Sequence, residues 1–484
     1  MLCFLMPARC YAVFGFFLLM SMSTQALETI APEALKPGMK GYALSVFQGM
    51  VPERFEVEVV DVVPGPWTAK RTLLVKAASE NAVRKIKAYG AGFSGSPVFF
   101  EGRIAGAVAY GEQFQQEHIL GVTLIGDMLA ELALSERAGD VSARVACGTC
   151  ELLPGAMITI PVVRGDIWMG SSGTVTATVG DKVLAFGHPN QFVGEHVVLP
   201  MHRAEVNGVM AKLDFSHKIV TPTADEIGAL IWDGEVAVVG RLGQKAPMLP
   251  YRIRYAEKTF NMEVVQHIEI LPGVVNAVLG KVVDSMAHID PEGLDLLVKY
   301  HIDWPDGERF DWQQRCSVKQ LAGQTKTLLT TLFSGHDAVQ RIDIELDEIP
   351  KGQVAKIVHV RFGPEAGKQA QSVPLYVDFL LRSGERVQRV FSVPIPSAYG
   401  AAIFPLQLMV GDALRPNVST SPRTPQQRAA WLSSILRSDE LVLLYPGERG
   451  QAFYAEAGLT RQVIRLPWRL SGTANVEIKV MHEK

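Results

Sequence analysis

Short apolar segments that alternate with polar residues recur along most of this chain, and turn residues separate them. Residues 54–60 (RFEVEVV) and 341–346 (RIDIEL) alternate in this way, as half-buried strands do. The 484 residues include 43 glycines and 28 prolines, which favour many short strands and turns over long helices. The pattern predicts a mainly β protein, with about three domains at roughly 150 residues each.

The first 26 residues have the features of a secretory signal peptide. Arg9 supplies a positive charge, residues 12–22 form a short apolar stretch, and residues 23–26 (STQA) offer small side chains before a cleavage site. The stretch is short for a membrane span, and no later run of about 18 apolar residues follows. We therefore expect a secreted or periplasmic protein with no stable membrane span, and an uncleaved anchor is the alternative.

The rest of the chain divides into three expected regions. The strand pattern predicts a β-barrel over residues 27–145, a second β-barrel over 146–285 and a β-sandwich-like region over 286–484. A short helix is expected in the first region over residues 125–135, after a hairpin of two apolar strands. Residues 424–436 predict a helix in the last region.

Charge and motif content exclude several classes of function. The formal net charge is −3, without the basic excess that a nucleic-acid-binding protein needs. No dinucleotide fingerprint or phosphate-binding loop is present, so no cofactor is expected. Cys147 and Cys150 form a C-x-x-C motif, but neither a following helix nor a second pair of zinc ligands accompanies it. A local disulfide or a reduced pair is the favoured interpretation, and a redox protein is a remote alternative.

The segment GFSGSP at residues 92–97 is the most informative motif of the chain. A serine nucleophile needs a tight bend, in which its own amide and the amide two residues earlier converge on one oxygen. Glycine allows that backbone geometry. The motif predicts Ser94 as the nucleophile, the amides of Gly92 and Ser94 as the oxyanion hole, and Ser96 as a support for the turn. An ordinary turn before a hairpin is the alternative.

A serine hydroxyl is a poor nucleophile without a base, and His188 is the best candidate for that base. It stands in residues 186–189 (FGHP), where a strand ends and a barrel rim would present its ring. In chymotrypsin-like peptidases the serine and the histidine come from two barrels that meet at a cleft. A structural histidine at a strand end is the alternative.

Both segments resemble the SpoIVB-type serine peptidases, the sporulation stage IV family. That family carries G-x-S-G-S-P and then an apolar hairpin, to which residues 92–97 and 101–108 are similar, and its histidine segment is similar to residues 173–188. The resemblance implies a trypsin-like double β-barrel, with Ser94 as nucleophile and His188 as base.

Three features depart from the sporulation enzymes. The histidine follows the serine in this chain, a permuted order that the geometry of a catalytic pair allows. No aspartate precedes the serine at the family's position, where Glu80 is a weak substitute as a third catalytic residue. No PDZ module is recognised. A Ser–His dyad and a chain without catalysis both remain open.

Two functions are compatible with these observations. One is an exported serine endopeptidase that hydrolyses peptide bonds through an acyl-enzyme, with a protein or peptide as substrate and the chain itself as one candidate. The other is a non-catalytic envelope protein that uses a peptidase-like fold for binding or as a scaffold. The absent aspartate is the main support for the second function.

Overall fold

The computed structural model of the protein describes most of the chain after the expected signal peptide. The segment 1–26, the pair Cys147 and Cys150, and most of the predicted helix over 424–436 lie outside the described residues. The described residues are 27–65, 70–86, 89–136, 145, 152–190, 196–212, 214–286, 294–333, 338–363, 371–395, 403–411, 424, 427, 431, 435–446 and 459–479.

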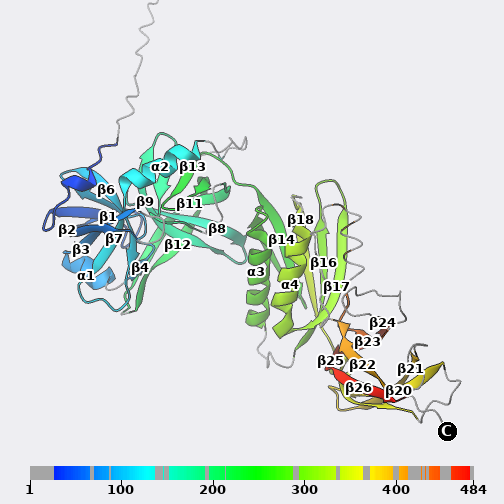
Figure 1. Ribbon diagram of the computed structural model, residues 1–484. Helices are drawn as coiled ribbons and strands as arrows, with labels where there is room; N and C mark the ends of the chain where they lie inside the picture. The colour runs from blue at the N-terminus through cyan, green and yellow to red at the C-terminus, as the bar shows by residue number, and fades with distance from the viewer. Residues whose placement is uncertain are drawn as a thin grey trace, which may run out of the picture.

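Six strands of the first region form a closed barrel (Figure 1). The predicted hairpin is present, and its turn places Glu101 and Gly102 at φ 50° and 76°, which suits a tight two-residue connection between strands. The helix predicted over residues 125–135 is also present. In barrel order the strands are β1 (Lys40–Ser45), β2 (Glu53–Pro64), β3 (Arg71–Ala77), β7 (Ile119–Leu124), β6 (Arg103–Gly111) and β5 (Pro97–Phe100), accompanied by η1 (Pro32–Ala34), α1 (Glu80–Ile86) and α2 (Ile125–Ser135).

A second ring of six strands follows, and the pairing of its first and last members closes it. One short strand from the first region, β4 (Tyr89–Ala91), pairs in parallel with this second ring just before the serine motif. In order of pairing the ring contains β8 (Met157–Gly165), β9 (Met169–Val179), β10 (Lys182–Ala185), β13 (Val238–Leu242), β12 (Phe215–Asp233) and β11 (Leu199–Met210).

Helix α2 joins the two barrels. Its buried Glu131 accepts hydrogen bonds from the indole N–H of Trp232 at 2.7 Å and from the amide of Glu235 at 2.8 Å. Apolar residues of both barrels, among them Met128 of α2 and Leu184 of β10, form one buried cluster at this junction. The barrels therefore meet through a packed interface at this junction.

The sheet of the second barrel continues into a layer of five further strands, and two helices cover one face of that layer (Figure 1). Strands β14 and β15 fall inside the range 146–285 and helix α3 ends one residue beyond it, although β14 pairs with β18 outside that range. These elements are β14 (Met248–Tyr255), β15 (Lys258–Val265), α3 (Leu271–Met286), β16 (Asp295–Asp303), β17 (Arg309–Ser317), α4 (Val318–Phe333) and β18 (Arg341–Glu348).

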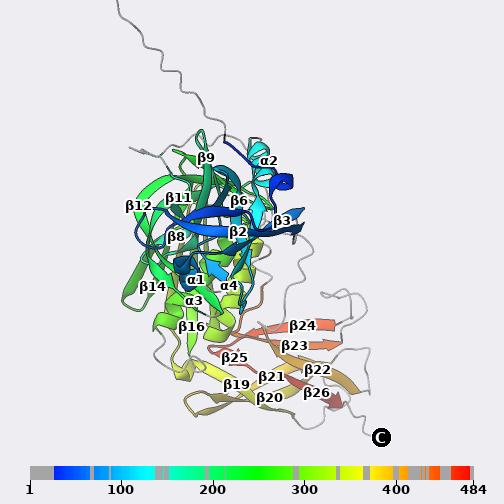
Figure 2. The ribbon, with the colours of Figure 1, turned by 90° about the vertical axis from the view of Figure 1, so that its left-hand side faces the viewer.

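Two four-stranded sheets form the C-terminal sandwich, with their apolar residues packed into one core (Figure 2). The mainly β fold, with barrels followed by a sandwich-like region, is confirmed. One sheet contains β21 (Arg386–Pro394), β20 (Ser372–Leu381), β19 (Val354–Phe362) and β25 (Arg469–Ser471), with η2 (Lys351–Gln353) before β19. The other contains β24 (Leu459–Arg465), β23 (Glu440–Pro446), β22 (Ile403–Val410) and β26 (Ala474–Lys479).

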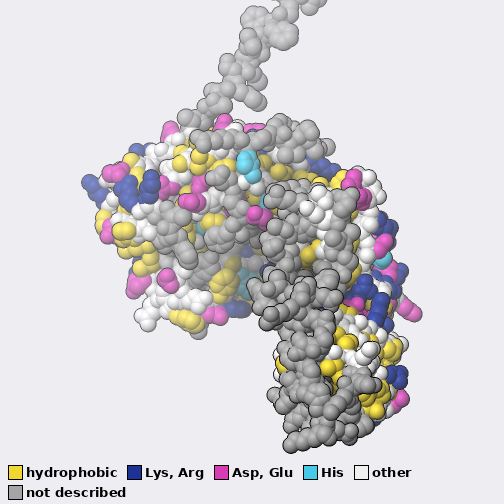
Figure 3. Space-filling view, turned by 45° about the vertical axis from the view of Figure 1, so that its right-hand side comes forward, with side chains coloured by type: hydrophobic (Ala, Val, Ile, Leu, Met, Phe, Trp, Pro, Cys, Tyr) yellow, Lys and Arg dark blue, Asp and Glu magenta, His cyan; other side chains and the backbone are white. Residues whose placement is uncertain are grey.

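The surface carries charges of both signs. On the face drawn in Figure 3, basic and acidic side chains are interspersed over the described regions. None of the helices in the described part of the chain is both long and apolar enough to cross a membrane.

Candidate functional site

The serine motif forms a tight loop between β4 and β5, and the second barrel holds its backbone. Gly92 and Gly95 adopt φ values of 86° and 96°, which favour glycine. A Cβ placed on Gly95 would lie 1.8 Å from the carbonyl oxygen of Thr174, so this backbone packs directly on β9. The hydroxyls of Thr174 and Thr176 donate to the carbonyls of Gly92 and Gly95, both at 2.8 Å. The shape of the loop therefore depends on both barrels.

The backbone amides of the loop fall into two groups. The amides of Phe93, Gly95 and Ser96 each donate to a backbone carbonyl at 2.7–3.1 Å. Among the residues that the structure describes, the amides of Gly92 and Ser94 make no hydrogen bond of normal distance and angle. These two amides are the pair that the motif predicts for an oxyanion hole, and both remain available to a ligand oxygen.

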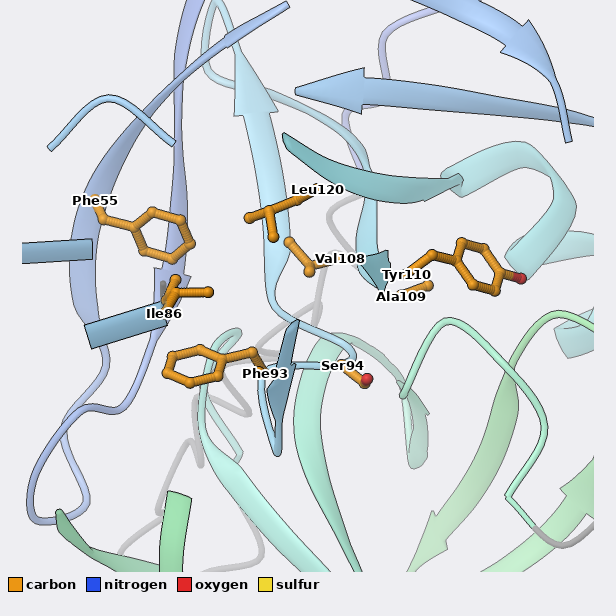
Figure 4. Close-up of a pocket in the computed structure, with 9 residues that line it drawn as sticks. Phe55, Ile86, Phe93, Ser94, Val108, Ala109, Tyr110 and Leu120 are labelled. Carbon is orange, nitrogen blue, oxygen red and sulfur yellow. The ribbon is translucent and has the colours of Figure 1, made fainter. Parts of the chain in front are cut away.

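The Ser94 side chain lies beside a small, mostly apolar pocket of the first barrel. Ser94 is 7% exposed, and its hydroxyl makes no hydrogen bond to another described residue. Figure 4 shows the side chains of Phe93 and Ser94 pointing in opposite directions from the loop. The pocket is lined by Phe55, Ile86, Gly90, Phe93, Ser94, Val108, Ala109, Tyr110 and Leu120.

The segment that carries His188 packs against the same loop. A Cβ placed on Gly95 would lie 2.6 Å from the amide nitrogen of Phe186, and one placed on Gly187 would lie 3.1 Å from the Cβ of Ala109 in the pocket wall. The structure thus brings together the two segments that the sequence assigns to nucleophile and base, from different barrels. His188 itself is half-buried.

The surroundings of the His188 ring favour its neutral form. Its Nδ1 lies 2.7 Å from the carbonyl oxygen of Pro189, and because a carbonyl only accepts, Nδ1 carries the proton and Nε2 keeps its lone pair. Burial lowers the pKa of His188, while the Pro189 carbonyl and the Asp233 carboxylate act in the opposite direction. A neutral ring with a free lone pair is the form that a general base requires.

Asp233 is an acidic residue near His188 that no sequence motif marks. It ends β12, is 3% exposed, and its Oδ1 accepts the amide N–H of Asn190 at 2.7 Å. Its charge acts on the His188 ring, but no hydrogen bond between their side chains is present within the described residues. Only the fold, which places the end of β12 beside the turn after β10, could have revealed it.

Glu80, the carboxylate suggested by sequence position, lies elsewhere in the first barrel region. It begins α1, is exposed, and forms no hydrogen bond or ion pair with another described residue. The helix that it begins ends at Ile86, which lines the pocket beside Ser94. No contact in the structure connects Glu80 with His188, and its role as a third catalytic residue stays a prediction.

Beneath the loop lies a buried polar group that the sequence did not indicate. The hydroxyl of Ser96, fully buried, donates to that of Ser45 at 2.9 Å, and the Lys218 ammonium donates to Ser45 at 2.8 Å. No described carboxylate pairs with Lys218, and burial lowers its pKa to about 7. Ser96 thus has a supporting position in the loop, with its hydroxyl turned toward the barrel interior.

Comparison of the chain with models of known protein families, with curated proteins and with solved structures finds no match. Within the described ranges, no group of three or more histidine, cysteine, aspartate or glutamate side chains is arranged to hold a metal ion. The resemblance to SpoIVB-type peptidases therefore rests on the sequence motifs alone.

Replacing Lys218 with methionine should change how stability depends on pH. The pKa of Lys218 is about 7 in the folded protein against 10.5 for an exposed lysine, so the unfolded state binds an extra proton between these values. The free energy of unfolding of the wild type should therefore rise with pH in this window, by up to about 1.4 kcal/mol per pH unit relative to Lys218→Met. Denaturant unfolding of both proteins at several pH values measures this, and parallel pH profiles would contradict it.

Replacing Asp233 with asparagine should lower the pKa of His188, because the carboxylate favours the charged ring. Titration of the His188 ring by NMR, with His188→Gln to assign its signal, measures the shift. Asp225→Asn on the same strand is a matched control, since Asp225 acts on His202 instead. An unchanged or higher pKa in Asp233→Asn would show that Asp233 does not act on the ring.

Proposed function

We propose that the chain is an exported serine endopeptidase of the SpoIVB type, with Ser94 and His188 as its catalytic pair. The observation that carries the proposal is the combination of two unbonded amides, at Gly92 and Ser94, with an unbonded serine hydroxyl on the same loop. The packing of the His188 segment against that loop supports it further. Secretion is part of the proposal on the evidence of residues 1–26 alone.

The arrangement suits acyl transfer. Ser94 Oγ attacks the carbonyl carbon of a peptide bond while His188 Nε2 takes its proton, and the amides of Gly92 and Ser94 stabilise the negative oxygen that forms. His188 then gives the proton to the leaving amine, and the C–N bond breaks to leave an acyl ester on Ser94. A water molecule, deprotonated by His188, attacks the ester carbon. The C–O bond to Ser94 then breaks, His188 returns the proton to Ser94 Oγ, and the acid product leaves.

The groups around His188 would support the charged ring during these steps. The Pro189 carbonyl holds the proton on Nδ1 throughout, and the Asp233 carboxylate provides a nearby negative charge. In a complete triad one aspartate both orients the histidine and stabilises its charged ring. Here the Pro189 carbonyl would do the first and the Asp233 carboxylate the second.

The second candidate is a non-catalytic binding or scaffold protein on the same fold. One observation favours it: His188 is not hydrogen-bonded to Asp233, whose carboxylate binds the Asn190 amide instead. In that case the sandwich would serve as the adhesion or assembly surface, and the serine loop would be retained without catalytic activity.

A fluorophosphonate probe distinguishes the two functions. The wild type should be labelled at Ser94; Ser94→Ala should abolish labelling at this position, and His188→Ala should slow it about 10²- to 10⁴-fold, as expected for loss of a general base. With a cleavable peptide, each variant should lose as much as about 10⁶-fold, and the double variant should be scarcely worse.

Two surface variants of the sandwich, Ser372→Ala and His359→Gln, are matched controls and should react like the wild type. Folded wild-type protein that resists the probe, or that reacts at a different serine, would leave the scaffold function as the better account.

A further inference from the structure

Lys218 lies under the serine loop, inside a polar group built from several elements. It belongs to β12, which pairs in parallel with β4 immediately before the loop. Its aliphatic chain fills the space that a side chain at position 92 would need, since a Cβ placed on Gly92 would lie 3.2 Å from the Lys218 Cδ. Its Nζ lies 4.4 Å from the centre of the Phe93 ring, a cation–π distance. The lysine thus packs beneath the two residues before Ser94.

Two hydrogen-bonded paths lead from Lys218 to the loop, one on each side of Ser94. On one side Nζ donates to Ser45, which accepts from Ser96. On the other side Nζ donates to the Thr174 hydroxyl at 3.4 Å, and that hydroxyl donates to the Gly92 carbonyl at 2.8 Å. A single amino group therefore connects the positions before and after the proposed nucleophile.

The free-energy cost of burying the Lys218 amino group indicates that this side chain has a role beyond packing. A buried amino group without a carboxylate loses its hydration, and an apolar side chain of similar shape would pack there at lower cost. The side chains that face Nζ are Ser45 of β1, Phe93 of the loop, Met157 of β8 and Thr174 of β9, and none of them carries a charge. Desolvation alone lowers its pKa, so no charged neighbour takes part.

We propose that Lys218 is a positioning residue that holds the loop on both sides of Ser94, so that the Gly92 and Ser94 amides point toward one oxygen. The proposal rests on the peptidase function proposed above. The protonated amino group has three hydrogens for its contacts with the Ser45 and Thr174 hydroxyls, the Met157 sulfur and the Phe93 ring, whereas the neutral group has two and no charge for the ring to attract. The charged form therefore holds the loop better than the neutral form.

The test compares Lys218→Met with the wild type by two measurements. The first is the rate at which a fluorophosphonate labels Ser94 between pH 5 and 9. The wild-type rate should fall on the alkaline side as Lys218 loses its proton, and Lys218→Met should be about 10- to 100-fold slower at neutral pH without that fall. This loss is smaller than the about 10²- to 10³-fold cost of removing an oxyanion-hole donor itself.

The second measurement is amide hydrogen exchange of residues 90–97, which does not depend on any reaction. Exchange in this segment should be faster in Lys218→Met, because both paths to the loop are lost. Lys182→Met is the matched control: Lys182 is also buried on a strand of the second barrel, but it pairs with Glu136. It should leave the labelling profile and the exchange of residues 90–97 unchanged.

Wild-type labelling and wild-type exchange in Lys218→Met would overturn the proposal while leaving the peptidase function intact. If the wild type is never labelled, the peptidase function fails, and the exchange of residues 90–97 alone decides whether Lys218 holds the loop. If Lys218→Met does not fold, Thr174→Val offers a second test, because it removes only one of the two paths and should increase exchange at Gly92. Thr178→Val on the same strand is its control. The Thr178 hydroxyl bonds the Leu152 carbonyl instead, so this variant should leave exchange at Gly92 unchanged. Equal exchange in these two threonine variants would also overturn the proposal.

Discussion

The contact between the serine loop and β9 is the interaction on which the site depends. The loop belongs to the first barrel by sequence, yet two threonine hydroxyls of the second barrel hold its carbonyls, and Gly95 lies directly on the β9 backbone. A larger residue at Gly95 would force backbone to shift at this point, because its Cβ would lie 1.8 Å from the Thr174 carbonyl oxygen and 2.6 Å from the Phe186 amide nitrogen. The two barrels therefore create one loop conformation jointly, and neither could impose it alone.

The contact between the two barrels also explains which residues of the site could be predicted from the sequence and which could not. Glycine spacing around Ser94 and the strand end at His188 are local signals, and the hairpin after the loop follows from alternation and a Glu-Gly turn. Asp233 and Lys218 carry no such signal. Each sits in an ordinary strand, and each becomes relevant only because β12 runs beneath the loop and ends beside the turn that carries His188. Long-range pairing of this kind cannot be derived from the periodicity of a single segment.

The C-terminal half shows a different limit of local patterns. Strands such as β18 and β20 follow from their alternation, but α3 and α4 were not expected. The sequence of α3 is rich in valine and glycine, which have weak helix propensity, and its helical state depends on packing of Val275, Leu279 and Val282 into the core of the adjoining sheet. Beyond it, buried Asp295 pairs with Arg469 at 2.9 Å and with Arg382, which attaches the sandwich to this layer.

The unbonded amides of Gly92 and Ser94 are the strongest argument for the peptidase function over the scaffold function. Ser94 is buried and Gly92 is half-buried. An amide that solvent does not reach costs about 1–3 kcal/mol when it lacks a partner, so a loop kept only for its shape would gain stability by turning such an amide toward a carbonyl. Among the described residues, the amides of Gly92 and Ser94 have no acceptor, while those of Phe93, Gly95 and Ser96 in the same loop donate to carbonyls. A rigid backbone does not explain why the Gly92 and Ser94 amides lack acceptors, since Gly92 and Gly95 would let the loop turn these amides toward a carbonyl. An incoming oxygen, bound by both amides beside the Ser94 hydroxyl, accounts for it directly.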